Sequence, residues 1–449
     1  MDLDAVMLSR IQFAMTIGFH YIFPSISIGL AWLVVLMEGL GWRKGDAAYV
    51  QLGKFFGKLF AMTFAMGVAT GITMEFQFGT NWAQYAKFVG DIFGAPLAAE
   101  AILSFFLEST FLGLYLFGRG RVSQGLHWFS ILMVAVGATL SAFWILVANS
   151  WQQTPAGYMF NAATGRAELT SFFLAVFNPS MIVRFLHVFD AALIAGAFFV
   201  AGIAAYRLLK DNQDIASRKA LRLAVIVAFV TSCLEIMPLG HHHAVQVAKY
   251  QPEKLAAMEG LFDTGPNAPL TIFGIPTADR LLMPVRIPGL LSLLVSNHFG
   301  TVVKGLNDFP PDERPPVVLP FVGFHGMVGL GMLFMALGAY GIFQLWRGTL
   351  YQDRLFLRVL IPVIPLPVIA AELGWITTEV GRQPWIVYHL LKTKDAISMT
   401  VSTGEIVFSL VLFALIYALL GVLYVYLLVR EVRRGPQPEP AQEDAASWI

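Results

Sequence analysis

Ionisable side chains interrupt several long apolar stretches of this sequence. Glu372 and Glu379 are seven residues apart, about two helical turns, so both lie on nearly the same side of one helix. A carboxylate within hydrocarbon is costly and usually faces a pocket, a partner or a cofactor. Arg382 follows about one turn later and is such a partner. Spacing alone is equally consistent with a buried Glu–Arg pair that only braces the helix.

Other apolar stretches contain side chains that can bind heme iron. His20 shares a helix face with Gln12 and Thr16, because the three are spaced four residues apart. His187 and Met327 lie in two further stretches, and imidazole and thioether are both axial ligands of heme iron. Each has a simpler interpretation, because a lone histidine in a membrane helix is usually a hydrogen-bonded structural group and methionine usually fills the core.

A third pattern has the residue types of a proton path. One apolar stretch contains Glu100, Ser104, Glu108 and Ser109. The two carboxylates are eight positions apart, so they differ in direction by only about 80° around a helix. Spaced ionisable groups are how membrane helices relay protons. The alternative is that burial keeps both acids protonated and inert.

Membrane helices must position these residues. Hydrophobic residues make up 57% of the chain and charged residues 13%, and the mean hydropathy is +0.67, which is typical of a polytopic membrane protein. Windows long enough to cross about 30 Å of hydrocarbon predict an all-α fold with nine transmembrane helices. We place these helices at 11–38, 55–78, 94–118, 126–150, 181–209, 219–240, 320–346, 357–381 and 405–429.

The predicted helices divide the chain into four regions. Residues 1–240 hold helices one to six, and residues 320–430 hold helices seven to nine. Residues 241–319, rich in proline and mixed charge, form a long loop between them, and residues 431–449 form a disordered tail. Basic residues concentrate in alternate loops, so the N-terminus and the long loop are predicted outside and the C-terminus in the cytoplasm. The acidic N-terminus predicts that helix one is retained rather than cleaved.

Composition excludes several classes of function. The net charge of +1 gives no basis for nucleic-acid binding. The single cysteine, Cys233, excludes disulfides, cysteine metal clusters and covalent heme attachment. Residues 53–59 (GKFFGKL) are one residue short of a phosphate-binding loop and lack its Ser or Thr.

The order of the motifs resembles subunit I of the cytochrome bd terminal oxidases, in the form with a short Q loop. The resemblance spans all nine helices and is carried by GWITTEVGRQPW at 374–385, EAILSFFLEST at 100–110 and SRIQFAMTIGFH at 9–20. It implies a quinol:oxygen oxidoreductase of the bacterial inner membrane. Such an enzyme oxidises membrane quinol on the outer side, reduces dioxygen to water with cytoplasmic protons, and generates proton-motive force without pumping.

The same resemblance implies three noncovalent hemes. His187 and Met327 would bind a low-spin heme b, while His20 and Glu379 would serve a high-spin heme b and heme d. Which of these two residues binds heme d stays open, as does a third heme b in its place. Glu75 and Trp375 are expected to line the heme pocket.

The resemblance also implies roles in catalysis and assembly. Glu100, Glu108 and Ser109 would form the proton path, and Arg382 would partner the heme ligand beside it. Lys254 and Glu259 in the loop would bind quinol, with the carboxylate accepting a proton and the amine stabilising negative charge. The expected partners are subunit II, in a heterodimer, and a small single-helix subunit, besides quinol and dioxygen.

Two departures from the family pattern leave alternatives open. His325 stands where the family usually has Arg, two residues before Met327, and is itself a candidate ligand. His241, His242 and His243 stand where an acidic residue is expected. One alternative is a bd-type oxidase with a donor other than quinol. Others are a heme-free proton or ion transporter that uses the buried carboxylates, and a heme-copper oxidase with copper on the three histidines.

Overall fold

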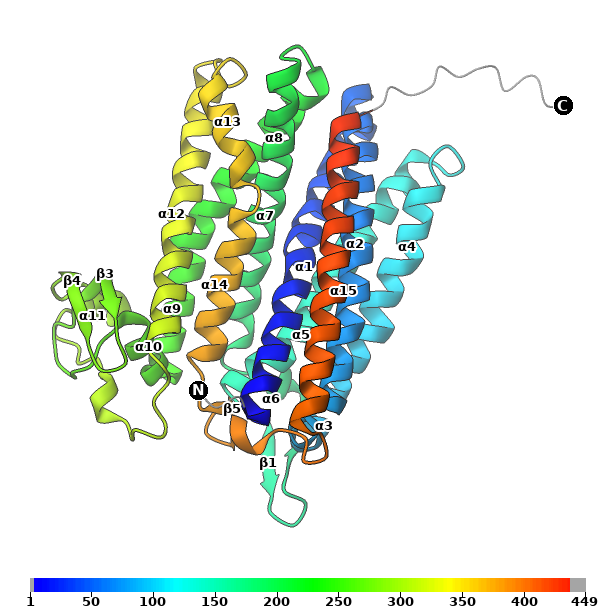
Figure 1. Cartoon of the computed structure of the whole chain (residues 1–449). Coiled ribbons are helices and arrows are strands. Elements are labelled where there is room, and N and C mark those ends of the chain that lie inside the picture. Colours follow the sequence, from blue (N-terminus) through cyan, green and yellow to red (C-terminus); the bar gives the residue numbers. More distant parts are fainter. Residues whose placement is uncertain (1–3, 437–449) are drawn as a thin grey trace.

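A computed structural model describes residues 4–436 of the chain. Within that range, nine helical segments are long and apolar enough to cross a membrane, which confirms the predicted all-α membrane fold (Figure 1). In chain order they are α1 (Ala5–Lys44), α2 (Ala47–Thr80), α3–η1–α4 (Ala83–Phe117), α5 (Gln124–Gln153), α7 (Met181–Lys210), α8–η2–α9 (Ile215–Tyr250), α12 (Val318–Trp346), α13–α14 (Arg354–Val380) and α15 (Thr403–Arg434).

Polar side chains define where several helices begin. Asp4 accepts a hydrogen bond from the backbone N–H of Met7 (2.8 Å) and so caps α1. Ser402 and Glu405 form a capping box at the start of α15. α15 ends in Arg433 and Arg434, a position where basic side chains interact favourably with the helix dipole.

Two of the spans contain a short π-helical segment. η1 (Glu100–Phe105) joins α3 (Ala83–Ala99) to α4 (Phe106–Phe117), and η2 (Glu235–Leu239) joins α8 (Ile215–Leu234) to α9 (Gly240–Tyr250). A π turn adds one residue to the helix and often occurs at functional sites. Both segments begin with a glutamate, so each wide turn sets the direction of an acidic side chain.

Close backbone packing forms the centre of the bundle. α1 crosses α7 where Gly29 meets Gly196, and a Cβ atom on Gly29 would lie only 1.9 Å from the carbonyl oxygen of Ala192. On α5, a Cβ on Gly137 would lie 2.6 Å from Cγ of Glu108. These glycines are required by close approach and not by an unusual backbone angle.

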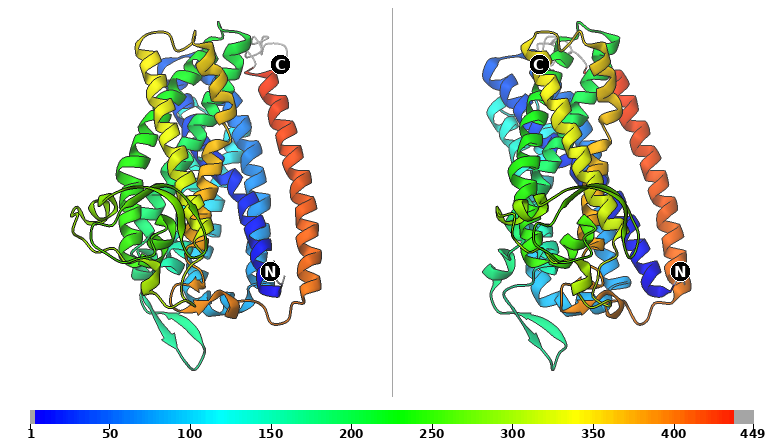
Figure 2. Two further views of the ribbon diagram at one scale, coloured as in Figure 1. Left: turned by 60° about the vertical axis from the view of Figure 1, so that its left-hand side comes forward. Right: turned by 90° about the vertical axis from the view of Figure 1, so that its left-hand side faces the viewer.

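The α3–α4 span and α15 leave broad apolar faces uncovered. The most apolar windows of the α3–α4 span and of α15 are only 11% buried. α15 runs along the edge of the bundle in both views of Figure 2. Such faces suit lipid or another membrane subunit.

The predicted loop at 241–319 is only partly a loop. Helix α9 carries helical structure to Tyr250, into the region predicted as a loop, because hydrogen bonding continues where the apolar sequence ends. The division of the chain at residue 240 stays a prediction. Beyond it lie α10 (Pro252–Glu259), the antiparallel hairpin of β3 (Leu270–Pro276) and β4 (Leu281–Ile287), α11 (Leu290–Ser296) and η3 (Leu306–Asp308).

Other short elements cover the same end of the bundle. They are β1 (Tyr158–Asn161), β2 (Arg166–Leu169), α6 (Phe172–Val176), β5 (Trp385–Val387), β6 (Leu391–Lys392) and η4 (Thr393–Asp395).

The two ends of the bundle agree with the relative sides predicted from basic residues. The start of α1 and the segment from α10 to β4 lie at one end, and the C-terminal end of α15 lies at the other (Figure 1). Which end faces outward stays a prediction. The predicted tail at 431–449 begins too early, because α15 reaches Arg434. Residues 437–449 lie outside the described part of the chain.

Candidate functional site

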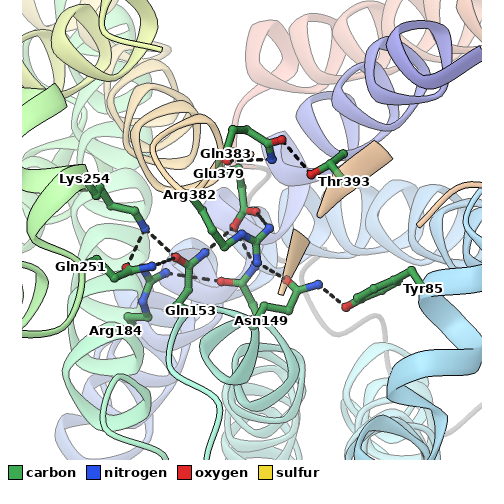
Figure 3. A network of polar contacts seen from close by, with 11 residues as sticks. Tyr85, Asn149, Gln153, Arg184, Gln251, Lys254, Glu379, Arg382, Gln383 and Thr393 are labelled. Atoms are coloured by element: carbon green, nitrogen blue, oxygen red, sulfur yellow. Dashed lines mark hydrogen bonds and ion pairs between the residues drawn. The ribbon is translucent and has the colours of Figure 1, made fainter. Parts of the chain in front are cut away.

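A layer of polar side chains surrounds Glu379 at the end of α14 (Figure 3). Its Oε1 accepts hydrogen bonds from Nδ2 of Asn149 (3.0 Å) and Nε2 of Gln153 (3.3 Å), both on α5. Its Oε2 pairs with the guanidinium of Arg382. The Glu–Arg partnership predicted from spacing is therefore present, and α5 adds two amide donors to it.

Arg382 extends this network toward α3. Its side chain is 5% exposed and donates to Oε1 of Gln152 (2.9 Å), which in turn hydrogen-bonds the hydroxyl of Tyr85. The residues after α14 join as well, because Oγ1 of Thr393 donates to Oε1 of Gln383 (2.8 Å). The network therefore links four parts of the chain that are distant in sequence.

Lys254 enters the same layer from α10. Its Nζ donates to Oε1 of Gln153 (2.5 Å) and Oε1 of Gln251 (2.8 Å), and the residue is 2% exposed. Burial holds the pKa of this amine well below its usual value, and the cations of Arg184 and Arg382 lower it further. The amine therefore lies in the same layer as the proposed heme ligand Glu379, linked to it through Gln153.

Glu259, the predicted partner of Lys254, points elsewhere. The two residues are five positions apart, which rotates their side chains by about 140° relative to one another around α10. Oε2 of Glu259 accepts from the backbone N–H of Thr271 on β3 (3.2 Å), and its backbone carbonyl accepts from the Thr271 hydroxyl (2.9 Å). Burial raises the pKa of Glu259 to about 8 despite the lowering effect of the Thr271 hydrogen bond. The structure therefore gives the two residues different surroundings.

Two buried guanidinium groups keep unused donors in this layer. Nε and Nη2 of Arg184 and Nε of Arg382 have no hydrogen-bond partner among residues 4–436. Buried charged donors are costly when unpaired, so this arrangement favours an anionic group from outside the chain. Heme propionates are carboxylates and have the required charge. The residues present thus fit a heme-binding layer.

His20 faces α2, on the helix face that it was predicted to share with Gln12 and Thr16. Its Nδ1 lies 2.9 Å from Oγ1 of Thr70, and a Cβ on the next residue, Gly71, would come within 3.2 Å of the ring. On the same face, Thr16 accepts a hydrogen bond from Gln77 (2.6 Å). Gly71 thus leaves the room that an imidazole needs between α1 and α2.

Trp375 joins α14 to α1. Its ring meets that of Tyr21 edge to face, with 5.4 Å between centroids. Tyr21 directly follows His20 in α1, and Trp375 precedes Glu379 by about one helical turn in α14. Trp375 therefore stands close to the predicted heme ligands.

The predicted proton path is assembled in part. Oε1 of Glu100 accepts from Ser141 on α5 (2.7 Å), and Glu108 and Ser104 are buried against Gly137 of the same helix. Ser109 is not on this face, because it is exposed and its hydroxyl donates to the carbonyl of Phe106 (3.3 Å) in its own helix.

Glu75 also lies near this path. Its side chain is exposed on α2 and interacts electrostatically with Glu100. It lies one helical turn after Gly71, the residue that faces the ring of His20.

His187 and Met327, the predicted ligands of a low-spin heme, each contact a different neighbouring helical segment. His187 on α7 has Nδ1 2.8 Å from Oε1 of Glu235, and its ring lies 4.9 Å from that of His243. Met327 on α12 packs against α14, where a Cβ on Gly374 would come within 2.7 Å of its sulfur.

The unexpected histidines have structural partners. The ring nitrogens of His325 lie 2.9 Å from the carbonyl oxygen of Phe321 and 3.0 Å from that of Thr271, so this ring joins α12 to β3. His242 contacts the carbonyl of Pro238 (2.6 Å) in its own helix. The described residues contain no cluster of three or more His, Cys, Asp or Glu side chains suited to a metal ion, so the copper interpretation has no support.

Sequence reasoning missed several members of the site. Gln152, Gln153, Arg184 and Gln251 lie at the ends of apolar windows, where polar residues are ordinary interface residues. The one available signal was the adjacent pair Gln152 and Gln153, which lies about one helical turn after Asn149 on α5.

Comparisons with known proteins agree with one another. Residues 8–436 match the family described as cytochrome bd terminal oxidase subunit I. The chain is 40% identical to cytochrome bd ubiquinol oxidase subunit 1 of Bacillus subtilis (97% of this chain, 95% of that protein) and 35% identical to cytochrome bd-II ubiquinol oxidase subunit 1 of Escherichia coli (98% of each). The solved bd oxidase of Geobacillus thermodenitrificans is similar, with a TM-score of 0.91 and 35% identity over 96% of this chain and 99% of that one.

Proposed function

The chain belongs to the cytochrome bd terminal oxidase subunit I family, and from this we propose how its polar layer serves a quinol oxidase. The protein is a multi-pass membrane subunit of a heme-containing oxidase complex that transfers electrons from quinol to dioxygen. The alternatives of a heme-free transporter and of a different electron donor are therefore set aside.

We assign the hemes to the side chains that the resemblance implies. His187 and Met327 would hold a low-spin heme b, and His20 and Glu379 would hold the high-spin heme b and heme d. When bound, these groups supply one-electron chemistry and the place where dioxygen is reduced. Arg184 and Arg382 would bind the heme propionates. The observation that carries this proposal is that both guanidinium groups have buried donors without a hydrogen-bond partner among the described residues.

The carboxylates of α3–η1–α4 would bring protons to this layer. Glu108 and Glu100 follow one another along the face that meets α5, and the hydroxyl of Ser141 contacts Glu100. Ser104 is buried between them and its hydroxyl has no hydrogen-bond partner in the described chain, so it can accept an ordered water. Ser109 lies off this face, and we leave it out of the path.

Quinol would be oxidised where α10 covers the bundle. Glu259, with a pKa of about 8, is close to the strength that suits a base near neutral pH. Lys254 would connect the quinol side of α10 to the Glu379 layer through Gln153. Because the two side chains diverge, each would act at its own end of α10.

The working unit is expected to be larger than this chain. The weakly covered faces of α3–α4 and α15 would accept subunit II and a small single-helix subunit. The N-terminus and the α10–β4 segment would face outward from a bacterial inner membrane and the C-terminal end of α15 inward.

A spectrum of the purified complex tests this proposal. Dithionite reduction should reveal low-spin and high-spin heme bands, and extraction should identify heme b and heme d. Replacing Glu379 with Gln should remove a high-spin band and abolish quinol-driven oxygen uptake, while the low-spin band should remain. A colourless complex, or full activity in this variant, would contradict the proposal.

A further inference from the structure

Four ionisable side chains meet in a second cluster beside the network of Figure 3, and one of them, His243, interacts electrostatically with Arg184 and Lys254 of that network. His187 and Asp190 come from α7, Glu235 is the first residue of η2, and His243 comes from α9. Asp190 is 5% exposed and Glu235 9% exposed. Of these four, only His187 has a role in the proposed oxidase chemistry, so the two buried acids require an explanation of their own.

Glu235 lies directly against the imidazole of His187. Its Oε1 is 2.8 Å from Nδ1, a contact that has the length of an ion pair but not the alignment of a hydrogen bond. A small rotation of either side chain would align it. The ring of His243 meets that of His187 edge to face at 4.9 Å, which limits how far the imidazole can turn.

Asp190 supports Glu235 from the next turn of α7. The two carboxyl groups are close enough to interact electrostatically. One oxygen of each, Oδ2 of Asp190 and Oε2 of Glu235, remains without a hydrogen-bond partner within the described range. Two buried acids in contact are costly, so their presence beside one histidine is better explained by an action on that histidine than by stability alone.

The π turn provides the direction of Glu235. η2 begins at this residue and contains Pro238, which has no backbone N–H to donate to a regular helix. The widened turn brings Glu235 toward α7. Without this π turn, α9 would be rotated differently relative to α8, and Glu235 and His243 would have a different relative direction.

We propose that Glu235, supported by Asp190, positions His187 by engaging its Nδ1, so that Nε2 is the nitrogen presented to heme iron. This inference rests on the proposed function, in which His187 is an iron ligand. Carboxylate partners of ligating histidines fix the orientation of the ring and raise its basicity. A more basic ligand and a nearby negative charge both favour the oxidised iron, so Glu235 keeps the potential of the low-spin heme low.

Redox titration of the assembled complex tests this role. Glu235→Gln keeps the shape of the side chain and removes its charge, so the low-spin spectrum should persist. The midpoint potential should rise enough to change the reduced-to-oxidised ratio at least tenfold, about 59 mV for one electron. Glu235→Ala removes the contact altogether and should convert part of the low-spin band to high-spin.

Glu38→Gln provides a matched control. Glu38 is another buried acid near a histidine, with Oε2 3.9 Å from Nδ1 of His127, but it lies near the C-terminal end of α1, toward the other end of the bundle. This variant should leave the midpoint potential unchanged.

The outcomes separate this inference from the function on which it rests. An unchanged potential in Glu235→Gln, measured in a complex with a normal low-spin band, would overturn the positioning role and leave the oxidase intact. Absence of a low-spin heme from the unmodified complex would overturn the heme assignment itself, and the positioning role with it. A raised potential that is also seen in Glu38→Gln would count against a specific effect of Glu235.

Discussion

Buried cations outnumber buried anions around Glu379. Arg184 and Arg382 are 3% and 5% exposed, and one carboxylate, Glu379, interacts with both of them. Lys254 adjoins the same group, and its pKa is lowered by its burial and by the two arginines. Removing charge from water costs several kcal/mol per ion unless it is paired. The layer is therefore organised to receive additional negative charge.

Arg184→Met should weaken the retention of heme. The variant removes two unpaired donors, and a hydrogen bond to a charged group is worth about 1.5–3 kcal/mol. We expect heme to be lost from the detergent-purified complex roughly ten to a hundred times faster, as measured by heme content per protein over time. The exposed Arg121→Met at the other end of the bundle serves as control. Equal rates of heme loss from the two variants would contradict the proposed contact between Arg184 and a propionate.

Glu259 should control the pH dependence of quinol oxidation. A carboxyl group whose pKa is raised to about 8 is protonated below that pH and becomes a base above it. The kcat/KM for quinol should therefore rise with pH toward a plateau above about 8. Steady-state oxygen uptake in Glu259→Gln should be low and should lack this rise.

Glu253 supplies the comparison for this experiment. Its burial alone would raise its pKa, but hydrogen bonds from His389 and Tyr388 outweigh that effect and lower it. It is therefore already ionised at neutral pH, and Glu253→Gln should retain the inflection near pH 8. An inflection that survives in Glu259→Gln would assign it to another group.

Single residues were predictable where their type is unusual for their surroundings. Glu379 and Arg382 stand out because a charge in an apolar stretch is rare. Lys254 and Glu259 were placed together from resemblance, and the helical rotation of α10 separates them. Gln153, which bonds both Glu379 and Lys254, gave little signal because glutamine at the end of a span is common.

At the scale of elements, two π segments direct acids into the bundle. η1 presents Glu100 to Ser141, and η2 presents Glu235 to His187. Hydrophobic periodicity predicted continuous helices here, because one inserted residue leaves the average apolar pattern nearly unchanged. The contacts of both acids therefore depend on local backbone geometry that spacing rules do not capture.

Gly137→Ala should loosen the contact between α5 and α4. The new methyl group would meet Cγ of Glu108 at 2.6 Å and the carbonyl oxygen of Ser104 at 3.2 Å. Overpacking of this kind costs about 1–3 kcal/mol, so we expect a lower melting temperature and slower oxygen uptake.

Gly113→Ala on α4 is the matched substitution. A Cβ at Gly113 meets nothing within 4 Å, and alanine is the better helix former. Its melting temperature should be unchanged or higher. Equal melting of the two variants would show that the α4–α5 contact yields easily.

For the whole molecule, length and hydropathy were enough to predict the number of spans. They were insufficient for the segment that follows the sixth span, where α9 extends past the apolar window to Tyr250 and a β hairpin follows. Hydropathy detects the membrane and not the helix, so a helix that continues into water is cut short in a sequence-based prediction. Specific contacts of Thr271 attach the hairpin instead, to His325 on α12 and to Glu259 on α10.

His325→Leu should free this hairpin from α12. Leucine cannot bridge the carbonyl oxygens of Phe321 and Thr271, so residues 270–287 should be cut faster in limited proteolysis. His242→Leu alters an exposed ring that contacts only its own helix turn and should leave the cleavage rate as it is. Similar rates in both variants would mean that other contacts hold the hairpin.

The sidedness of the molecule can be tested with single cysteines. In a Cys233→Ala background, Ala278→Cys lies in the β3–β4 turn and Gln213→Cys between α7 and α8, at opposite ends of the bundle. A membrane-impermeant maleimide should label the first in intact cells and the second only after permeabilisation. The reverse pattern would invert the predicted orientation.

The network of Figure 3 has a consequence for biosynthesis. Its members range from Tyr85 on α3 to Thr393 beyond α14, with contributions from α5, α7 and α10 between them. A ribosome has to complete nearly the whole polypeptide before these side chains can meet. Loading of the prosthetic groups therefore belongs to a late step of maturation, and a chain truncated before α14 should reach the membrane without being able to retain them.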